Sequence, residues 1–328
     1  MKSSAPAGVG DAPDGSNAPP RGLPPRPDLL ANMLDGTKRN AVPIRRAFVQ
    51  VPPVKGADPA ATRGAVLAKL VKIRQPAYLD AFLLIHAMAS ASEPYTAQYP
   101  AITWAHALGF DEHVGAGVGA DNLGARAKWS KIVQKLKAEH LITSKRSGNE
   151  MTYHLLNESG DDTAYTRPKT AEDGKWLSIP DIYWRGDFYM TLSLPAKAML
   201  LIALHEKDDF PLPIDRVPRW YGISASTAQR GFAELTKEGI LSHRSVWRID
   251  PKSPTGYTEE RRYSLVGPWR AKKGAKPTGG PKFGKSAKGK PKPKKQSIDE
   301  LIAGLNQAGT KSKASASSKS GKAPRKPA

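Results

Sequence analysis

The chain has 328 residues, 39% of them hydrophobic, which is enough for about two folded domains once the polar ends are set aside. Lys and Arg number 51 against 30 Asp and Glu, and the resulting net charge of +21 favours a polyanionic partner. Cysteine is absent, which excludes a disulfide scaffold, thiolate zinc sites and a cysteine nucleophile. No apolar run reaches the roughly 18 residues of a membrane span and no secretory signal is visible, so we expect a cytoplasmic, nucleoid-associated protein without a membrane partner.

The segment at 1–42 is rich in Pro, Gly, Ala and Ser, a composition that buries too little apolar surface to offset chain entropy. We expect it to be disordered. Within it, residues 28–34 (DLLANML) have the spacing of a short amphipathic turn, for which a transient helix without a partner is the alternative interpretation.

Residues 65–157 have the apolar pattern of one compact unit. The expected elements, in chain order, are helices at 78–89, 104–108 and 125–140 and strands at 141–145 and 151–156, with the turn of the hairpin at 147–149. Thr103 is placed to cap the second helix and Gly109 to end it. One apolar face of the third helix is formed by Trp129, Ile132, Val133, Leu136 and His140.

Residues 158–175 are polar and predict a linker to a second unit at 176–269. An aromatic-rich stretch, 176–190, is expected to pack onto that unit. The elements that follow are helices at 196–205, 214–221 and 224–238 and strands at 240–249 and 261–266, with a loop at 250–260. Ser193 caps the first of these helices, Gly222 makes a turn and Gly239 ends the third helix. The two units therefore share an order of elements without sharing sequence.

The most specific local pattern is WYGISASTAQRGFAELTKEGIL at 220–241, in which a short helix ends in Gly and a Ser-capped helix of the form S-x-S-T-x-x-R follows. The matching positions are Gly222, Ile223, Ser224, Ser226, Thr227, Arg230, Leu235, Gly239, Ile240 and Leu241. This pattern resembles the helix-turn-helix of winged-helix DNA-binding proteins, including plasmid and phage replication initiators and bacterial transcriptional regulators. The resemblance covers residues 193–267. It implies a mainly α fold with small β-wings (α+β), built as two consecutive winged-helix domains flanked by disordered tails.

The helical pattern of 224–238 separates an inner from an outer face. Ala228, Gly231, Phe232 and Leu235 are expected to point inward, and Ser226, Gln229, Arg230 and Lys237 outward, with Thr227 at the edge. A helix fits the major groove, where Gln reads adenine and Arg reads guanine, while hydroxyls at a helix N-terminus suit phosphates. Gly in mid-helix costs ~1 kcal/mol relative to Ala, and we expect Gly231 to allow close approach of the second helix of its unit.

The candidate DNA-binding residues of the second unit are Ser224, Ser226, Thr227, Gln229, Arg230 and Lys237 on the helix and Arg244, Arg248, Lys252, Arg261 and Arg262 on the wing. Those of the first unit are Lys128, Lys131 and Lys135 on its third helix and Lys145 and Arg146 on its hairpin. In the replication initiators that the chain resembles, the first winged helix often serves dimerisation as well as DNA contact. A dimer surface or a solvated basic face is therefore the alternative for the first unit.

The positive charge is concentrated at 270–328, which has seventeen Lys and Arg against Asp299 and Glu300 and so carries +15 of the total +21. A disordered polycation of this kind binds phosphates without sequence preference, and a solvated tail without a specific role is the alternative. One island, 297–308, combines an apolar stripe with capping-box spacing between Ser297 and Glu300. We expect a short helix there, either docking on a protein partner or without function.

The sequence contains only weak matches to motifs of catalysis and cofactor binding. The string at 279–286 (GGPKFGKS) fits a P-loop but follows no strand, and that at 115–120 fits a loose dinucleotide fingerprint but lies between two helices. His86, His106 and His140 come from three helices of one unit, where packed or hydrogen-bonded histidines are favoured over a metal site. We expect no metal, no cofactor and no enzyme activity.

Three hypotheses about function stay open. The main one is sequence-specific binding of double-stranded DNA, as a transcriptional regulator or a replication initiator, with a homodimer also left open. The second is a structural or interaction protein whose winged helices pair with protein while the basic tail binds nucleic acid nonspecifically. The third is a nucleic-acid enzyme whose chemistry has no recognisable motif.

Overall fold

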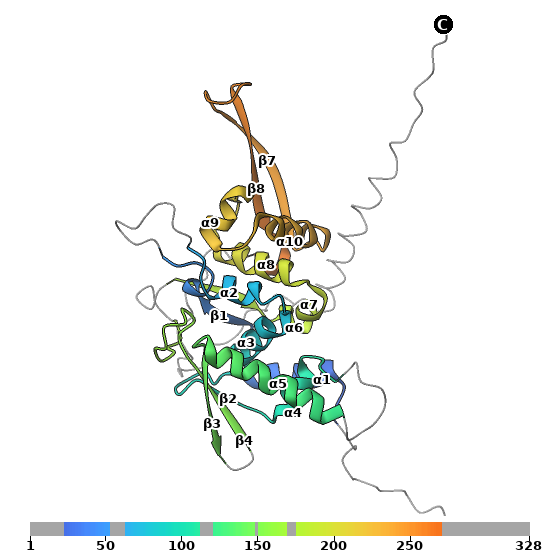
Figure 1. The fold of residues 1–328 in the computed structure, drawn as a ribbon. Helices are drawn as coiled ribbons and strands as arrows, with labels where there is room; N and C mark the ends of the chain where they lie inside the picture. Colours follow the sequence, from blue (N-terminus) through green and yellow to red (C-terminus); the bar gives the residue numbers. More distant parts are fainter. Residues whose placement is uncertain (1–22, 53–62, 112–120, 148–149, 169–174, 271–328) are drawn as a thin grey trace, which may run out of the picture.

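The structure, a computed structural model, describes residues 23–52, 63–111, 121–147, 150–168 and 175–270 (Figure 1). They form a mixed α+β fold with ten α-helices and three small antiparallel sheets. None of the described helices is both long and apolar enough to cross a membrane. The following predicted features lie outside the described residues: the disordered ends at 1–22 and 271–328, the short helix at 297–308, the fingerprint-like and P-loop-like strings at 115–120 and 279–286, and turn residues 148–149.

The first described helix, α1 (Arg26–Thr37), lies in the segment for which we predicted disorder. It packs against α3, α4 and α6 and buries Leu30, Met33 and Leu34, which lie on one face of the helix. The strand that follows, β1 (Ala41–Arg45), pairs antiparallel with β5 (Trp176–Pro180). The prediction of disorder is therefore corrected for residues 23–42, because their partners lie far along the chain and local composition does not reveal them.

A first repeat occupies residues 66–155. Its elements are α2 (Val66–Lys72), α3 (Pro76–Met88), β2 (Thr96–Gln98), α4 (Ala101–Ala107), α5 (Asp121–Ala138), β3 (Ile142–Ser147) and β4 (Glu150–Leu155), and its sheet has the order β2-β4-β3. The helices join the sheet through three aromatic side chains. Trp104 of α4 stacks on Trp129 of α5 at 5.3 Å between ring centroids, and the indole Nε1 of Trp129 donates to the hydroxyl of Tyr153 on β4 at 2.8 Å.

A second repeat occupies residues 194–265. Its elements are α8 (Leu194–His205), β6 (Phe210–Pro211), the short 3-10 helix η2 (Ile214–Arg216), α9 (Val217–Tyr221), α10 (Ala225–Lys237), β7 (Leu241–Ile249) and β8 (Tyr257–Leu265). The sheet order is β6-β8-β7, so in both repeats the last strand lies in the middle of a three-stranded antiparallel sheet. The connectivity of α3, β2, α4, α5, β3 and β4 is thus repeated by α8, β6, α9, α10, β7 and β8.

The remaining elements are short helices that precede, connect and follow the two repeats. They are η1 (Arg46–Phe48), α6 (Ile182–Arg185), α7 (Phe188–Thr191) and η3 (Gly267–Trp269). As expected for the aromatic-rich stretch, Tyr183, Trp184 and Tyr189 are buried, and β5 packs against α8 of the second repeat. The hairpins β3–β4 and β7–β8 project from opposite ends of the molecule (Figure 1).

Three local predictions are corrected. Thr103 is a buried residue inside α4 rather than its cap, because the helix begins earlier, directly after Pro100. His140 follows α5 with a left-handed backbone and an exposed side chain, so it is not part of the apolar face. The last strand begins at Tyr257 instead of Arg261, which makes the second hairpin longer than the pattern of turn residues predicted.

The segment predicted to be a polar linker contains a buried ion pair. Glu158 is completely buried, and its Oε2 accepts from Nη1 of Arg45 on β1 at 2.8 Å, while its Oε1 accepts from the backbone N–H of the same residue at 3.1 Å. Burial raises the pKa of the Glu158 carboxyl, and the Arg45 guanidinium opposes that shift. Residues that look like a solvated connection in the sequence therefore attach β1 to the end of the first repeat.

A second buried ion pair joins the two repeats. Nζ of Lys197 on α8 donates to Oδ2 of Asp80 on α3 at 2.7 Å, and the hydroxyl of Tyr183 on α6 donates to the other carboxylate oxygen at 3.3 Å. Burial raises the pKa of Asp80 to about 6, although Lys197 opposes the shift. Each buried charge is stabilised mainly by the other, because both side chains are almost completely shielded from water.

We expect Lys197→Met to lower the free energy of unfolding by about 3–5 kcal/mol, because it leaves Asp80 buried without its cation. The double variant Asp80→Leu/Lys197→Met should recover most of that loss, as replacing a whole buried pair by apolar groups is often neutral. Urea unfolding measures both. Asp215→Ala, in the exposed pair with Arg216, is the control and should change stability by less than about 1 kcal/mol. Strictly additive losses in the double variant would contradict the pair's mutual dependence.

Candidate nucleic-acid interface

The local sequence fixes both ends of α10. Gly222 adopts φ 67°, a left-handed backbone that ends α9 and turns the chain. The Oγ of Ser224 accepts from the backbone N–H of Thr227 at 3.2 Å and caps the new helix, as the sequence predicted. Gly239, at φ 69°, follows the last turn. These three turn and cap residues set the direction in which α10 leaves the body of the second repeat.

The inner face of α10 is the one expected from its apolar spacing. Its buried residues are Ala228, Gly231, Phe232 and Leu235. Phe232 stacks on Tyr263 of β8 at 4.4 Å between ring centroids. The helix is therefore held against the sheet on one side and against α8 on the other.

The outer face of α10 presents exposed polar side chains to solvent. These are Ser226, Gln229, Arg230 and Lys237, with Thr227 half-buried at the edge and Ser224 exposed at the cap. The Nε of Arg230 makes one long hydrogen bond of 3.4 Å to the carbonyl of Ser226 on its own helix. Within the described part of the chain, neither Arg230 nor Lys237 has a carboxylate oxygen within 4 Å, so both cations face solvent without a partner of opposite charge.

Gly231 is explained by the packing of α10 on α8. A Cβ built at this position would lie 2.4 Å from the carbonyl oxygen of Pro195 and 2.6 Å from Cγ of Met199. We expected a close approach by the second helix of the unit, and the neighbour is instead the first, α8. A glycine at mid-helix thus allows the two helices to touch along their backbones.

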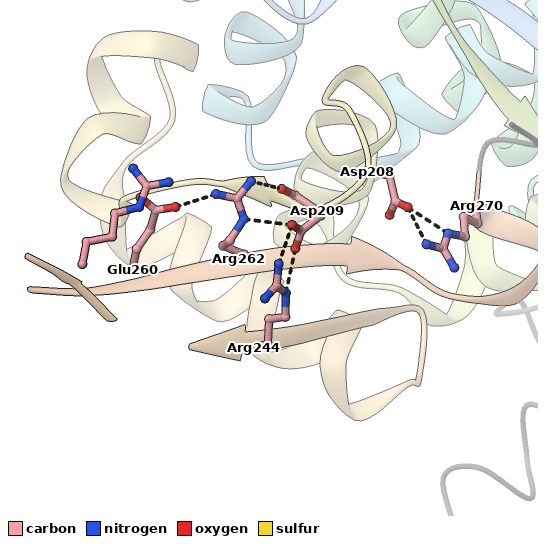
Figure 2. Close-up of polar contacts among 7 residues, drawn as sticks. Asp208, Asp209, Arg244, Glu260, Arg262 and Arg270 are labelled. Atoms are coloured by element: carbon pink, nitrogen blue, oxygen red, sulfur yellow. Dashed lines mark hydrogen bonds and ion pairs between the residues drawn. The ribbon is translucent and has the colours of Figure 1, made fainter. Parts of the chain in front are cut away.

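Three of the five candidate wing cations form ion pairs within the protein (Figure 2). Asp209 accepts from Arg244 at 2.7 and 3.0 Å and from Arg262 at 3.0 Å. Glu260 pairs with Arg262 at 2.8 Å and with Arg248 at 3.0 Å. Hydrogen bonds from Arg244, followed by those from Arg262, keep the pKa of Asp209 below its usual value. This cluster neutralises much of the wing's charge and fixes the loop before β6 to the hairpin.

Two wing candidates stay unpaired. Arg261 on β8 and Lys252 in the turn are exposed, and in the described residues no carboxylate oxygen lies within 4 Å of either side chain. A further ion pair, Arg270 with Asp208 at 2.5 Å, lies at the base of the same sheet (Figure 2). Of the candidate cations of the second repeat, those without a carboxylate partner in the described residues are therefore Arg230 and Lys237 on α10 and Arg261 and Lys252 on the wing.

The candidate cations of the first repeat are partly engaged. Nζ of Lys128 lies 4.1 Å from the ring centroid of Phe110, and Lys135 pairs with Glu139 at 2.7 Å. Lys131, Lys145 and Arg146 are exposed. Helix α5 thus presents a weaker basic face than its sequence suggests.

Residues on the N-terminal side of α2, namely Gln50, Arg63 and Gly64, pack on the turn before α10. The sequence did not predict this contact. The backbone N–H of Arg63 donates to the carbonyl of Arg219 at 2.9 Å, and Nε2 of Gln50 donates to the carbonyl of Trp220 at 3.0 Å. Cα of Gly222 would lie only 2.8 Å from a Cβ at Gly64. No local sequence pattern predicts these long-range contacts, which support the turn that positions α10.

The histidines provide no metal site among the described residues, where no three His, Cys, Asp or Glu side chains are placed to hold an ion. His86 is packed between Phe82 and Tyr165, and burial lowers its pKa to about 3. His106 pairs with Asp111 and His140 with Asp162, so the three side chains do not converge.

The chain matches no protein-family model, no curated protein and no solved structure. Function is therefore inferred from the geometry and chemistry of these residues.

We expect Gly231→Ala to destabilise the protein, although alanine has the higher helix propensity, because the added methyl group meets the backbone of Pro195. The expected loss is about 1–3 kcal/mol. Gly124→Ala on α5 is a matched control, since a Cβ there has no atom within 4 Å, and it should stabilise by about 0.5–1 kcal/mol. Thermal unfolding distinguishes them. Equal shifts of Tm for the two variants would refute close packing at Gly231.

Proposed function

We propose that this protein binds double-stranded DNA sequence-specifically, with α10 as the helix that enters the major groove and the two repeats acting as winged-helix domains. The observation that carries the proposal is the outer face of α10, where Gln229 and Arg230 are exposed side by side on a rigidly anchored helix. The repeated order of three helices and a three-stranded antiparallel sheet agrees with the winged-helix resemblance.

The dimensions and chemistry of α10 support groove reading. An α-helix with its side chains is about 10–12 Å across, close to the roughly 12 Å width of the major groove. Gln pairs with two atoms of adenine and Arg with two atoms of guanine, so adjacent Gln229 and Arg230 suit a short base sequence. The hydroxyls of Ser224 and Thr227 at the N-terminus of the helix suit the phosphates beside the groove.

Most of the net positive charge lies in the C-terminal segment of the sequence, at 270–328. The sequence outside 270–328 has a net charge of +6, and the wing's ion pairs reduce what it offers to DNA. Most of the nonspecific attraction to phosphates would therefore come from the lysines of 270–328, while α10 would supply the sequence preference. Transcriptional regulators and replication initiators both work through such a site, and the target sequence would distinguish these roles.

The first test measures binding to the best duplex selected from random DNA and to a random duplex of equal length. Arg230→Ala should lose about 1–3 kcal/mol on the selected duplex, roughly 5-fold to 150-fold in Kd, with little change on the random one. Lys237→Ala, on the same face, is the control and should weaken both alike, as a phosphate contact does.

An unchanged ratio of the two affinities in Arg230→Ala would overturn the role of α10 in base reading. A wild-type protein without preference for any duplex at any salt concentration would favour the interaction-protein hypothesis instead.

Deleting residues 271–328 should weaken binding to the selected and random duplexes by similar factors. The cut retains Arg270, because this residue pairs with Asp208 beside the buried Trp269. For each phosphate that the shortened protein no longer neutralises, the slope of log K against log salt should fall by about 0.9. Filter binding over a salt series measures the slope. A deletion that leaves the slope unchanged would show that this segment does not contact the duplex.

A further inference from the structure

The ribbon β7–β8 extends well beyond the core of the second repeat (Figure 1). Each strand has nine residues, and residues directly opposite each other share a face of the ribbon. One face contains the pairs Leu241–Leu265, His243–Tyr263, Ser245–Arg261, Trp247–Glu259 and Ile249–Tyr257. The other contains Ser242–Ser264, Arg244–Arg262, Val246–Glu260 and Arg248–Thr258.

The face that includes Trp247 and Ile249 is buried at the base of the ribbon and exposed near its turn. At its base Leu241, Tyr263 and Leu265 are buried, and Tyr263 stacks on Phe232 of α10. Toward the turn the same face exposes large apolar groups, with exposed fractions of 67% for Trp247, 79% for Ile249 and 53% for Tyr257. We name these three residues the tip cluster. Three such groups gathered on one face mark an interaction surface more often than chance exposure.

The opposite face is occupied by the ion pairs of Asp209 and Glu260 with the wing arginines. The two unpaired cations lie near the tip cluster. Arg261 is on the same face, two residues from Glu259 along β8, and Lys252 is in the turn that joins the strands. Glu259 stands opposite Trp247 on this face, and its Oε1 accepts a hydrogen bond from the hydroxyl of Ser245. An apolar cluster with exposed cations beside it fits a polyanion with an apolar interior, such as the stacked bases of a duplex between their phosphates.

The ribbon has the length to reach a second groove. On β8, Tyr263 is the last residue of the face that is anchored to α10, and Tyr257 lies six residues closer to the turn of the hairpin. At about 3.3 Å per residue, the segment between them spans roughly 20 Å. Half a helical turn of B-DNA, which separates a major groove from the adjacent minor groove, is roughly 17 Å.

We propose that the tip cluster enters the minor groove next to the major groove held by α10, where Ile249 acts as an apolar wedge between base pairs and bends the duplex. Trp247 and Tyr257 pack beside it against the sugars, and Lys252 and Arg261 contact the flanking phosphates. Apolar wedges in the minor groove unstack a base step and kink the duplex by about 20–90°. This inference rests on the proposed function and adds to it a mode of contact and a deformation of the DNA.

The test uses the full chain and the selected duplex labelled with a dye at each end. Wild type should shorten the distance between the dyes on binding, as measured by energy transfer. Ile249→Ser should abolish most of this shortening and weaken binding about tenfold, while Ile249→Phe, which restores a wedge, should retain both. Val246→Ser, at an apolar position on the opposite face, is the matched control and should bend the duplex as wild type does.

A second measurement separates wedging from a general loss of affinity. Single mismatches are moved along the minor groove beside the site, since a mismatched step costs less to unstack. Wild type should bind most tightly when the mismatch lies at the wedge step, and Ile249→Ser should show no such optimum. All substitutions are at exposed or half-buried wing positions, and circular dichroism checks that each variant is folded.

Wild-type bending and mismatch preference in Ile249→Ser would overturn the wedge. So would unchanged bending together with a loss of dimer in sedimentation, which would assign the tip cluster to a second copy of the chain. Failure of the proposed function gives a different result, in which wild type and Arg230→Ala bind every duplex equally.

Discussion

The packing of α10 against α8 determines which side chains of the second repeat reach solvent. Gly231 allows the two helices to approach until its Cα faces the carbonyl of Pro195, and Phe232 presses the adjacent side of α10 against Tyr263. With these two sides fixed, the rotation of the helix about its axis is fixed too, and Gln229 and Arg230 can only point outward. The proposed reading of bases would need such fixed side-chain positions, because a small error in placement breaks paired hydrogen bonds.

The number of arginines in the wing sequence overstates the positive charge that is free to attract an anionic partner. Arg244, Arg248 and Arg262 all look available in the sequence, yet each is bound by Asp209 or Glu260. Such pairs at the surface contribute little stability on their own, but a shared carboxylate between two arginines fixes the base of the ribbon. Among the described candidate cations of the second repeat, those without a carboxylate within 4 Å are Arg230 and Lys237 on the outer face of α10 and Arg261 and Lys252 near the tip cluster.

The sequence predicted best those features that depend on neighbouring residues. The caps at Ser193 and Ser224, the left-handed turn at Gly222 and the two faces of α10 follow from local hydrogen bonding and helical periodicity, and all are confirmed. The failures depend on distant partners. The burial of Glu158 requires Arg45, more than a hundred residues away, and α1 packs against three other helices that lie far along the chain. The early start of β8 has the same origin, since its outer residues are ordered by pairing with β7 and not by their own propensity.

The relation between the two repeats is held by buried charge. Burying Asp80 and Lys197 costs desolvation energy that apolar residues would not, and a placement of α3 against α8 that separated the two groups would leave both charges buried without a partner. Arg45 and Glu158 impose a similar condition on β1. With the repeats fixed in this way, the β3–β4 and β7–β8 hairpins point away from each other (Figure 1). In the proposed complex with DNA on α10, the β3–β4 hairpin, which contains Lys145 and Arg146, would therefore project from the opposite end of the molecule.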